Sequence, residues 1–209
     1  MSKWEYGEFY KKYNMEGIIN IGTGMVKVHD IFEPLPEFMK TADCIFSDPP
    51  CSEGNLTSFY TKADKEKTQF FEDFKKRFFE CIDEINPRTL FIEVFANNRD
   101  EFVDECKKRY KTVWALDSHY YHNKKNKCWI IYASDNPDDK LARLLDGKDE
   151  QKIIELICRW GDFERIGDLC MGRGLVGFYA NKYGKAFVGT ELNPKRLAVL
   201  LERINTCKL

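Results

Sequence analysis

The sequence predicts an α/β protein with one doubly wound, mostly parallel sheet of seven strands and an antiparallel hairpin at one edge. Two observations support this fold class. Seven short β-rich runs alternate with helical segments, a pattern typical of right-handed crossovers in a parallel sheet that is covered on both faces. The chain has 209 residues, 43% of them hydrophobic, which is enough for one well-buried core and too few for two large domains. We therefore expect residues 1–209 to form a single domain.

The strands and helices are predicted from local residue patterns. The strand candidates are residues 25–30, 43–48, 89–95, 112–118, 128–133, 166–170 and 186–191. Apolar residues at three- and four-residue steps predict a helix over about 64–86. Asp149 caps a second helix, and Asn193 followed by Pro194 begins a third. No helix separates the two strands within 112–133, so we expect them to pair as the edge hairpin.

Charge and cysteine usage exclude several classes of protein. The 33 basic and 34 acidic residues give a net charge of -1, so a polyanion site must be local. No apolar run is long enough to cross a bilayer, and residues 1–13 are charged and aromatic, unlike a signal peptide; we expect a cytoplasmic protein without membrane contact. The eight cysteines include no CxxC pair, which argues against a zinc site and for free, mostly buried thiols. We expect no metal.

Ligands of a doubly wound sheet bind beyond the carboxyl ends of the strands, and two such ends here suggest a nucleoside-containing cofactor. The run Asp168-Leu169-Cys170-Met171-Gly172-Arg173-Gly174 ends a strand in GxG and opens a helix, so its backbone can approach a ligand closely. The next strand ends at Glu191, about 17 to 20 residues later, the spacing of a carboxylate that binds both ribose hydroxyls. Asp30 ends another strand and is placed to reach an adenine ring. A plain turn and a solvated loop carboxylate are the alternative interpretations.

A third strand end, Asp48-Pro49-Pro50-Cys51, is the most specific signal in the sequence. Two prolines cannot continue a strand ladder, and they stiffen the chain where the strand ends. They leave the Asp48 carboxylate and the Pro49 carbonyl as acceptors without local donors. This pair is suited to bind an exocyclic amine through its two hydrogens, although a Pro-Pro turn alone is also compatible with a structural role.

The order of these motifs resembles that of the circularly permuted, β-class DNA amino-methyltransferases of the adenine-N6 family, which use S-adenosylmethionine and have a Rossmann-like fold. In that family a DPPY-type tetrapeptide precedes an FxGxG turn and a strand that ends in Glu; residues 48–51, 170–174 and 189–195 stand in those places, and the likeness covers nearly the whole chain. The resemblance implies transfer of a methyl group from S-adenosylmethionine to an exocyclic amine of a nucleobase, adenine N6 in DNA. It implies as catalytic residues Asp48, Pro49, Pro50 and Cys51, and as cofactor-binding residues Asp30, Asp168, Cys170, Gly172, Gly174, Glu191 and Asn193.

Position 51 departs from the family pattern, because Cys51 stands where the family has an aromatic residue that stacks on the extruded base. Phe59 or Tyr60 would supply the missing ring.

Cys51 also leaves a second chemistry open. Cytosine carbon-5 methyltransferases place a nucleophilic cysteine directly after a proline at this strand end and use a glutamate on the following strand, near the place of Glu93. A third alternative is a methyltransferase fold that has lost catalysis and acts as a binding module.

One stretch of the sequence is suited to contact a polynucleotide. Residues 107–127 contain seven basic residues against the single Asp117, and the hairpin turn within them mixes aromatic and basic groups. The nucleic acid, DNA or alternatively RNA, would contact Tyr60, His122, Lys124 and Lys125. Residues 52–62 have the length of a loop that closes over the base. No segment is large enough for a separate target-recognition domain, so specificity would come from loops, a homodimer partner or a specificity subunit.

The interpretation depends on three strand ends that meet in one crevice. Asp48 comes from the early half of the chain, and Gly172 and Glu191 come from the late half. We therefore expect Asp48 and Gly172 to open onto the same side of the molecule.

Overall fold

All seven predicted strands form, and two short strands are added to them. The computed structural model describes residues 6–209; residues 1–5, part of the stretch compared with a signal peptide, lie outside the described residues. The predicted strands are β2 (Gly24–Val28), β3 (Cys44–Ser47), β4 (Thr89–Val94), β5 (Thr112–His119), β6 (Lys127–Ser134), β8 (Arg165–Asp168) and β9 (Ala186–Glu191). The two additional strands are β1 (Ile18–Ile21) and β7 (Lys148–Asp149).

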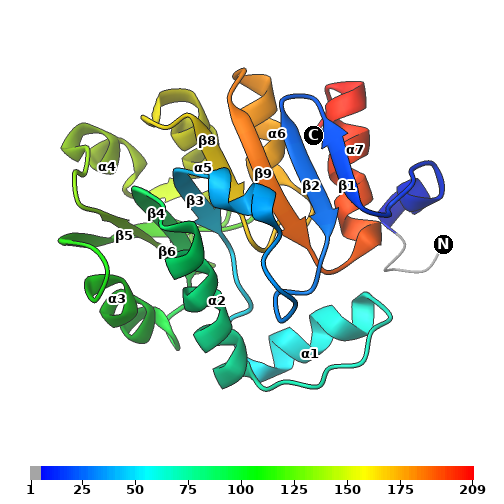
Figure 1. Ribbon diagram of the computed structural model, residues 1–209. Coiled ribbons are helices and arrows are strands. Elements are labelled where there is room, and N and C mark those ends of the chain that lie inside the picture. The colour runs from blue at the N-terminus through cyan, green and yellow to red at the C-terminus, as the bar shows by residue number, and fades with distance from the viewer. Residues whose placement is uncertain (1–5) are drawn as a thin grey trace.

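The nine strands form one mixed sheet in the order β1-β2-β9-β8-β3-β4-β6-β5-β7 (Figure 1). The five strands from β2 to β4 in this order are parallel neighbours, as predicted. β6 runs antiparallel to both β4 and β5, so β5 points in the same direction as β3 and β4. The predicted hairpin lies one strand in from the edge, because β7 pairs with the end of β5. β1 and β2 form a second antiparallel pair at the other edge.

Helices connect most of the parallel strands. Their bounds are η1 (Tyr6–Lys11), η2 (Glu37–Thr41), α1 (Glu53–Lys62), α2 (Phe71–Ile85), α3 (Arg99–Lys107), α4 (Asp139–Leu145), α5 (Glu150–Trp160), α6 (Leu175–Lys182) and α7 (Pro194–Thr206). The predicted caps are confirmed: the Asp149 side chain accepts from Gln151 N at the start of α5, and Asn193 accepts from Lys195 N at the start of α7.

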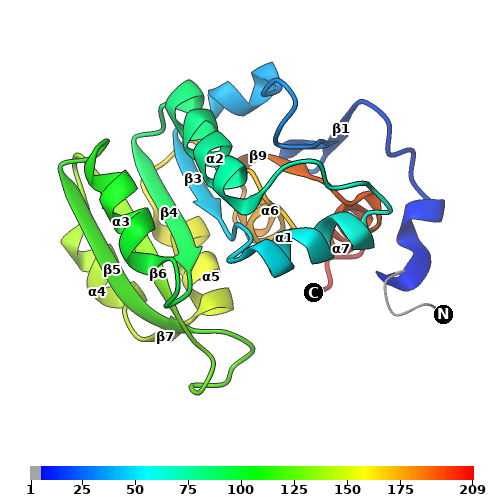
Figure 2. The same ribbon diagram turned by 90° about the horizontal axis from the view of Figure 1, so that it is seen from below.

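Two predictions were wrong, one about where a helix begins and one about a segment expected as a loop. The helix expected from about residue 64 begins at Phe71, because Phe70 is the N-cap residue and the Asp73 carboxylate accepts from its amide. Residues 52–62, expected as a loop, form α1, with Ser52 as an N-cap that accepts from Asn55 N. α1 lies below the sheet in Figure 1, and Figure 2 views it from that side.

The sheet divides the core into two hydrophobic clusters, one on each face. One cluster contains apolar side chains of α4, α5, α6 and α7, and the other contains those of α1, α2, α3 and η2. Within β3, Phe46 belongs to the first cluster and Ile45 to the second, because successive side chains point to opposite faces. This burial on both faces is what a doubly wound sheet requires. It fixes the strand ends that carry the polar residues of the motifs.

Candidate active site

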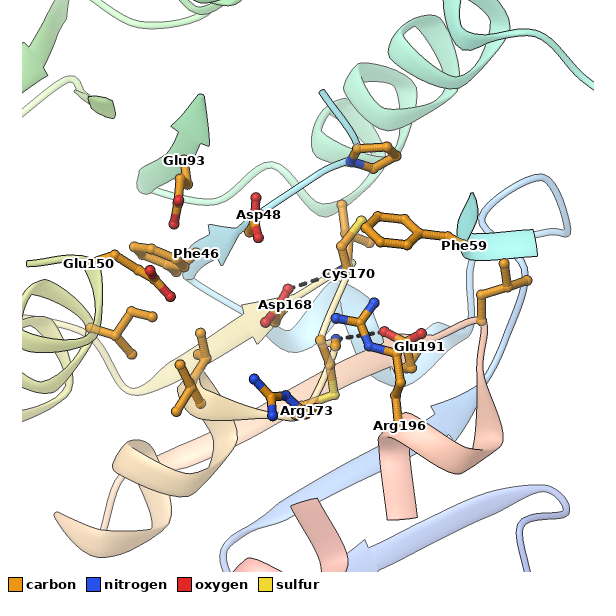
Figure 3. A pocket seen from close by; sticks show the side chains of 18 of the residues that line it. Phe46, Asp48, Phe59, Glu93, Glu150, Asp168, Cys170, Arg173, Glu191 and Arg196 are labelled. Atoms are coloured by element: carbon orange, nitrogen blue, oxygen red, sulfur yellow. Dashed lines mark hydrogen bonds between the residues drawn. The ribbon is translucent and has the colours of Figure 1, made fainter. Parts of the chain in front are cut away.

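The three motifs meet at the carboxyl edge of the sheet, as expected. β8 pairs with both β9 and β3, so the residues after these strands are neighbours in space. Asp48, Gly172 and Glu191 line one cavity of about 530 Å³, a volume within the usual range for a small-molecule site. Figure 3 shows the side chains that line it, with the Asp48 carboxylate toward one end and Glu191 toward the other.

Glu191 is bound by the backbone from two sides. Gly172 N donates to its Oε2 at 2.6 Å, and Asn193 N donates to its Oε1 at 2.9 Å. Gly172 has φ +55, in the left-handed region that favours glycine. Each carboxylate oxygen has two acceptor sites, so one on each oxygen remains for a diol. This arrangement suits the predicted ribose contact.

Asp168 joins β8 to β3 at the floor of the cavity. Its Oδ1 accepts from Ser47 Oγ at 3.1 Å and from Cys170 N at 2.9 Å. Ser47 Oγ in turn accepts from Leu169 N at 2.9 Å. Burial is the main cause that raises the pKa of Asp168, to about 7. Asp168 therefore stabilises the glycine turn as well as lining the cavity.

Arg196 of α7 is a cavity residue that the sequence did not single out. Its guanidinium lies 5.1 Å from the centre of the Phe59 ring, and its Nε is buried without a hydrogen-bond partner among residues 6–209. A Cβ added to Gly172 would lie 3.0 Å from an Arg196 terminal nitrogen, so the Arg196 side chain would have to shift slightly to admit another residue there. A polar ligand bound beside Glu191 would accept a hydrogen bond from this buried donor.

Asp30 and Tyr60 lie together in the cavity wall. The Tyr60 hydroxyl donates to Asp30, with both carboxylate oxygens at 2.8 Å. Tyr60 belongs to the hydrophobic cluster against which Cys170 packs, and burial together with Asp30 raises the pKa of Tyr60. We expected Tyr60 at the target base; in the structure it lines the cavity with its hydroxyl bonded to Asp30.

Three carboxyl groups face one another at the Asp48 end of the cavity. Figure 3 shows Asp48, Glu93 and Glu150 around the Phe46 ring. Glu93 ends β4 and is buried; burial first, and then the Asp48 charge, raises its pKa well above the ordinary value. Burial and the Asp48 charge also raise the pKa of Glu150 to about 7. Glu150 was not predicted, because only the packing of α5 against the sheet brings it here.

Asp48 itself is accessible from the cavity but enclosed by protein. This loss of bulk solvent raises its pKa to about 6, and the opposing effect of the Arg196 charge is smaller. Pro50 lines the cavity beside it. Pro49 and Cys51 are not among the cavity-lining residues.

The contacts of Cys51 are those of a turn. Its amide donates to Asn55 Oδ1 at 3.2 Å, and its carbonyl accepts from Asn97 Nδ2 at 2.6 Å. Burial raises the pKa of its thiol. A nucleophilic cysteine needs a lowered pKa, so these surroundings do not activate Cys51.

Two predicted cofactor residues are explained by packing. Gly174 caps α6 with φ +74, and a Cβ there would come within 2.5 Å of Leu200 Cβ. Asn193 caps α7, and its Nδ2 donates to Lys62 O at 2.8 Å. Neither is among the residues that line the cavity. Both therefore position the residues around the cavity.

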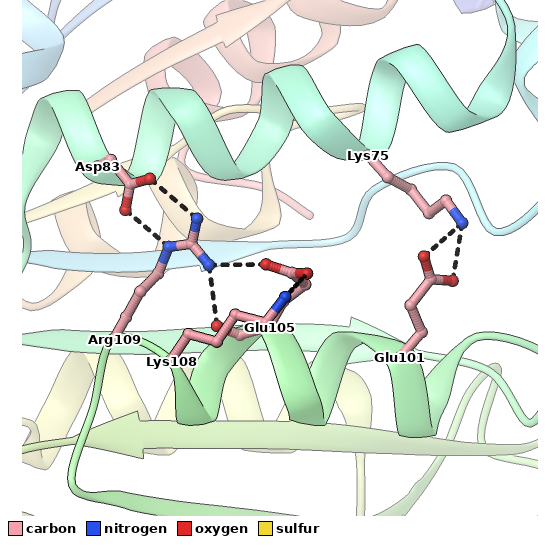
Figure 4. Close-up of polar contacts among 6 residues, drawn as sticks. All are labelled: Lys75, Asp83, Glu101, Glu105, Lys108 and Arg109. Carbon is pink, nitrogen blue, oxygen red and sulfur yellow. Dashed lines mark hydrogen bonds and ion pairs between the residues drawn. The ribbon is translucent and has the colours of Figure 1, made fainter.

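The predicted basic surface is divided between the two ends of the hairpin. Three basic side chains that precede β5 are paired, as Lys107–Asp104, Lys108–Glu105 and Arg109–Asp83; Figure 4 shows the last two pairs. Lys124 and Lys125 lie in the turn at the other end and are exposed, with no acidic partner among residues 6–209. This turn is at the carboxyl edge of β4 and β5, on the side of the cavity. His122 in the same turn lines the cavity.

Solved structures of DNA methyltransferases have a similar fold. TTHA0409 from Thermus thermophilus, assigned as a DNA modification methylase, superposes with a TM-score of 0.59 and 15% identity over 87% of this chain and 94% of that chain. M1.HpyAVI gives a TM-score of 0.55 and 15% identity over 86% and 98%. The cytosine-N4-specific PvuII DNA methyltransferase gives 0.56 and 10% identity over 87% and 86%. TTHA0409 and M1.HpyAVI have also been solved with S-adenosylmethionine.

The likeness at these identities is one of fold. No protein-family model and no curated protein sequence matches the chain. Within residues 6–209, no helix is long and apolar enough to cross a membrane. In the same residues, no cluster of three or more His, Cys, Asp and Glu side chains is arranged to hold a metal ion.

Proposed function

We propose that this chain is an S-adenosylmethionine-dependent methyltransferase that acts on an exocyclic amine of a nucleobase, adenine N6 in DNA. The observation that carries the proposal is the shared cavity. An amine-binding carboxylate, Asp48, opens into the same 530 Å³ space as the glycine turn and Glu191. Fold similarity to DNA methyltransferases supports the same conclusion.

The cavity residues fit the proposed cofactor. Glu191 would bind the ribose hydroxyls through its remaining acceptor sites, and the backbone at Gly172 permits close approach. Cys170 and Phe59 provide an apolar wall beside Glu191 (Figure 3). Asp168 lies at the floor of the cavity and would hold the methionine end of the cofactor, as the resemblance implies. The bound cofactor would supply an electrophilic methyl group on a sulfonium.

Asp48 lines the cavity and would bind one hydrogen of the target amine; the Pro49 carbonyl would bind the other, although Pro49 is not among the cavity-lining residues. Two accepted hydrogen bonds direct the nitrogen lone pair away from the acceptors and toward the methyl group. A new N–C bond forms as the S–C bond breaks, and the nitrogen becomes positively charged. The Asp48 carboxylate stabilises this charge and accepts a proton from the nitrogen. No covalent bond to the protein is needed.

The contacts of Cys51 favour this amine chemistry over carbon-5 methylation. Its thiol is not among the cavity-lining groups, and its pKa is raised. Glu93 does lie in the cavity, but without an activated thiol the ring attack that precedes carbon-5 methylation has no nucleophile.

The test supplies isotopically labelled S-adenosylmethionine together with genomic DNA or with total RNA, followed by mass spectrometry of the digested nucleosides. The proposal predicts labelled N6-methyladenine from DNA, and Asp48→Ala as a control should remove the label without loss of cofactor binding. Labelled N4-methylcytosine would correct the base, and label only in RNA would correct the polymer. Labelled 5-methylcytosine would contradict the mechanism. Calorimetry with S-adenosylhomocysteine is the second measurement. A folded chain that does not bind this compound would contradict the proposal and favour the alternative of a methyltransferase fold that has lost catalysis.

A further inference from the structure

The cavity lacks a ring at position 51, and the first aromatic residues after it in the sequence, Phe59 and Tyr60, are engaged elsewhere. The Tyr60 hydroxyl is bonded to Asp30, and the side chain is buried. Phe59 lies against the guanidinium of Arg196, toward the Glu191 end of the cavity (Figure 3). The Phe46 ring does lie beside Asp48 (Figure 3), but it is only 2% exposed and stacks on Phe91 in the core.

Tyr121 is a cavity-lining aromatic residue in the hairpin turn that was expected to contact a polynucleotide, although it was not itself among the predicted contact residues. It lies in the turn between β5 and β6, the green loop that projects beyond β7 in Figure 2. The turn stands at the carboxyl edge of the sheet, next to the ends of β4 and β5. Tyr121 lines the cavity together with Glu93 and Glu150, yet 73% of it remains exposed. It is the most exposed of the large hydrophobic residues in the described part of the chain.

One short segment links this turn to Cys51. The segment follows β4, and its Phe95 packs edge-on against the Tyr120 ring with centroids 5.5 Å apart. Two residues later, Asn97 donates to the Cys51 carbonyl at 2.6 Å. The turn that carries Tyr121 and the turn that carries Cys51 therefore contact the same segment.

The backbone holds Tyr121 in an uncommon conformation. Tyr121 and His122 have consecutive positive φ values of 56 and 54, which cost free energy in residues other than glycine. His122 N donates to Asp149 Oδ2 at 2.7 Å, and Tyr120 N donates to Asn126 O at 3.1 Å. The cap of α5 and the turn itself thus fix the backbone on both sides of an exposed ring.

We propose that Tyr121 stacks on the target base and takes the place of the aromatic residue that position 51 lacks. This inference rests on the proposed function, because it assigns the ring that holds the base while Asp48 binds the amine. Lys124 and Lys125 in the same turn would contact the flanking phosphates. The hairpin then binds both the base and the backbone of the strand.

The test compares Tyr121→Ala with Tyr121→Phe, and uses Trp160→Ala as the matched control. Trp160 is 58% exposed and is not among the cavity-lining residues. The probe is a mixed-sequence single-stranded DNA with one 2-aminopurine, titrated into protein saturated with S-adenosylhomocysteine. Stacking on one aromatic side chain contributes enough that Tyr121→Ala should weaken probe binding about tenfold or more. Tyr121→Ala should also restore the 2-aminopurine emission that stacking on the ring reduces. Tyr121→Phe and Trp160→Ala should behave as the unsubstituted chain does.

The affinity for S-adenosylhomocysteine separates this inference from the proposed function. We expect it to be unchanged in all three variants, and kcat/KM for genomic DNA to fall only in Tyr121→Ala. Equal probe binding and emission in Tyr121→Ala and Trp160→Ala would overturn the assignment of Tyr121 while the proposed function stands. Loss of S-adenosylhomocysteine binding in Tyr121→Ala would also overturn it, since the ring would then be structural. An unsubstituted chain that binds neither S-adenosylhomocysteine nor the probe would overturn both.

Discussion

Gly172 N donates to Glu191 Oε2 at 2.6 Å, and this bond ties the turn after β8 to the end of β9. Asn193 N holds the other oxygen, so the carboxylate closes a ring of contacts between two strand ends and the start of α7. Glu191 therefore has two roles. It organises the glycine turn, and it presents its remaining acceptor sites to the cavity.

Glu191→Gln should weaken binding of S-adenosylhomocysteine by at least about tenfold, because the amide nitrogen cannot accept hydrogen bonds from a ribose. The same nitrogen would face a backbone donor, so we expect a loss of about 1–3 kcal/mol in the free energy of unfolding. Calorimetry and denaturant unfolding measure the two effects. Glu37→Gln is the control, since 85% of the Glu37 side chain is exposed. Unchanged affinity in Glu191→Gln would exclude the ribose contact.

Asp48 should cause the rate of methyl transfer to fall on the acidic side of its pH profile, which we call the acidic limb. The surrounding cavity walls raise the pKa of Asp48 to about 6 although the side chain is exposed to the cavity, and the protonated form presents a donor where the amine needs an acceptor. At saturating cofactor, kcat should fall as the pH is lowered through about 6, approaching tenfold per pH unit. Asp48→Asn should reduce kcat at every pH by about a hundredfold or more and remove this limb. A pH profile that keeps the same limb in Asp48→Asn would assign it to another group.

Glu150 should destabilise the folded protein at neutral and alkaline pH. Burial and neighbouring carboxylates raise its pKa from 4.5 to about 7, so the folded state binds this proton more tightly than the unfolded state. The preference of the folded state for protonated Glu150 contributes fully to stability below pH 4.5, and this contribution is lost as the pH rises through about 7. Glu150→Gln should therefore raise the free energy of unfolding at pH 8 by up to about 1 kcal/mol after solvent screening, with no gain at pH 4. Thermal unfolding at both pH values measures this, and an equal change at both would refute the electrostatic cause.

Elements with strong local signals could be predicted from the sequence. Asn193-Pro194 begins α7 and Asp149 begins α5 because the capping side chain and the first turn are adjacent in the chain. α1 was missed although Ser52 caps it, because only Leu56 and Tyr60 of this helix are buried and its apolar stripe is correspondingly weak. β7 has two residues, too few for any periodicity.

The chemistry of the site was predictable where it belongs to one strand end. Asp48 directly follows β3 and Glu191 is the last residue of β9, and the parallel order of β9, β8 and β3 brings them together. Arg196, Glu150 and Tyr121 reach the cavity from a helix face, a helix start and a hairpin turn. Their positions depend on packing between elements distant in sequence, which no local pattern records.

Cys51→Ala should retain methyl transfer within about threefold of the unsubstituted rate. The thiol has a raised pKa and is not among the cavity-lining groups, so its removal leaves Asp48 and the cavity in place. Transfer of labelled methyl groups to genomic DNA measures the rate. Trapping with 5-fluorocytosine-containing DNA is the complementary measurement, since only a cysteine nucleophile forms a lasting covalent complex. Activity lost in Cys51→Ala together with such a complex would establish the carbon-5 mechanism instead.

Gly174 and Gly184 allow backbone strain to be separated from steric exclusion at the glycine turn. Both have positive φ, +74 and +68, but a Cβ at Gly174 would lie 2.5 Å from Leu200 Cβ, whereas nothing lies within 4 Å at Gly184. Gly184→Ala should cost about 1–2 kcal/mol from the left-handed conformation alone. Gly174→Ala should cost more, and because the added methyl pushes α7 away from the turn, it should also weaken S-adenosylhomocysteine binding. Denaturant unfolding and calorimetry compare the two variants, and equal losses of stability would mean that contact with Leu200 does not require glycine at 174.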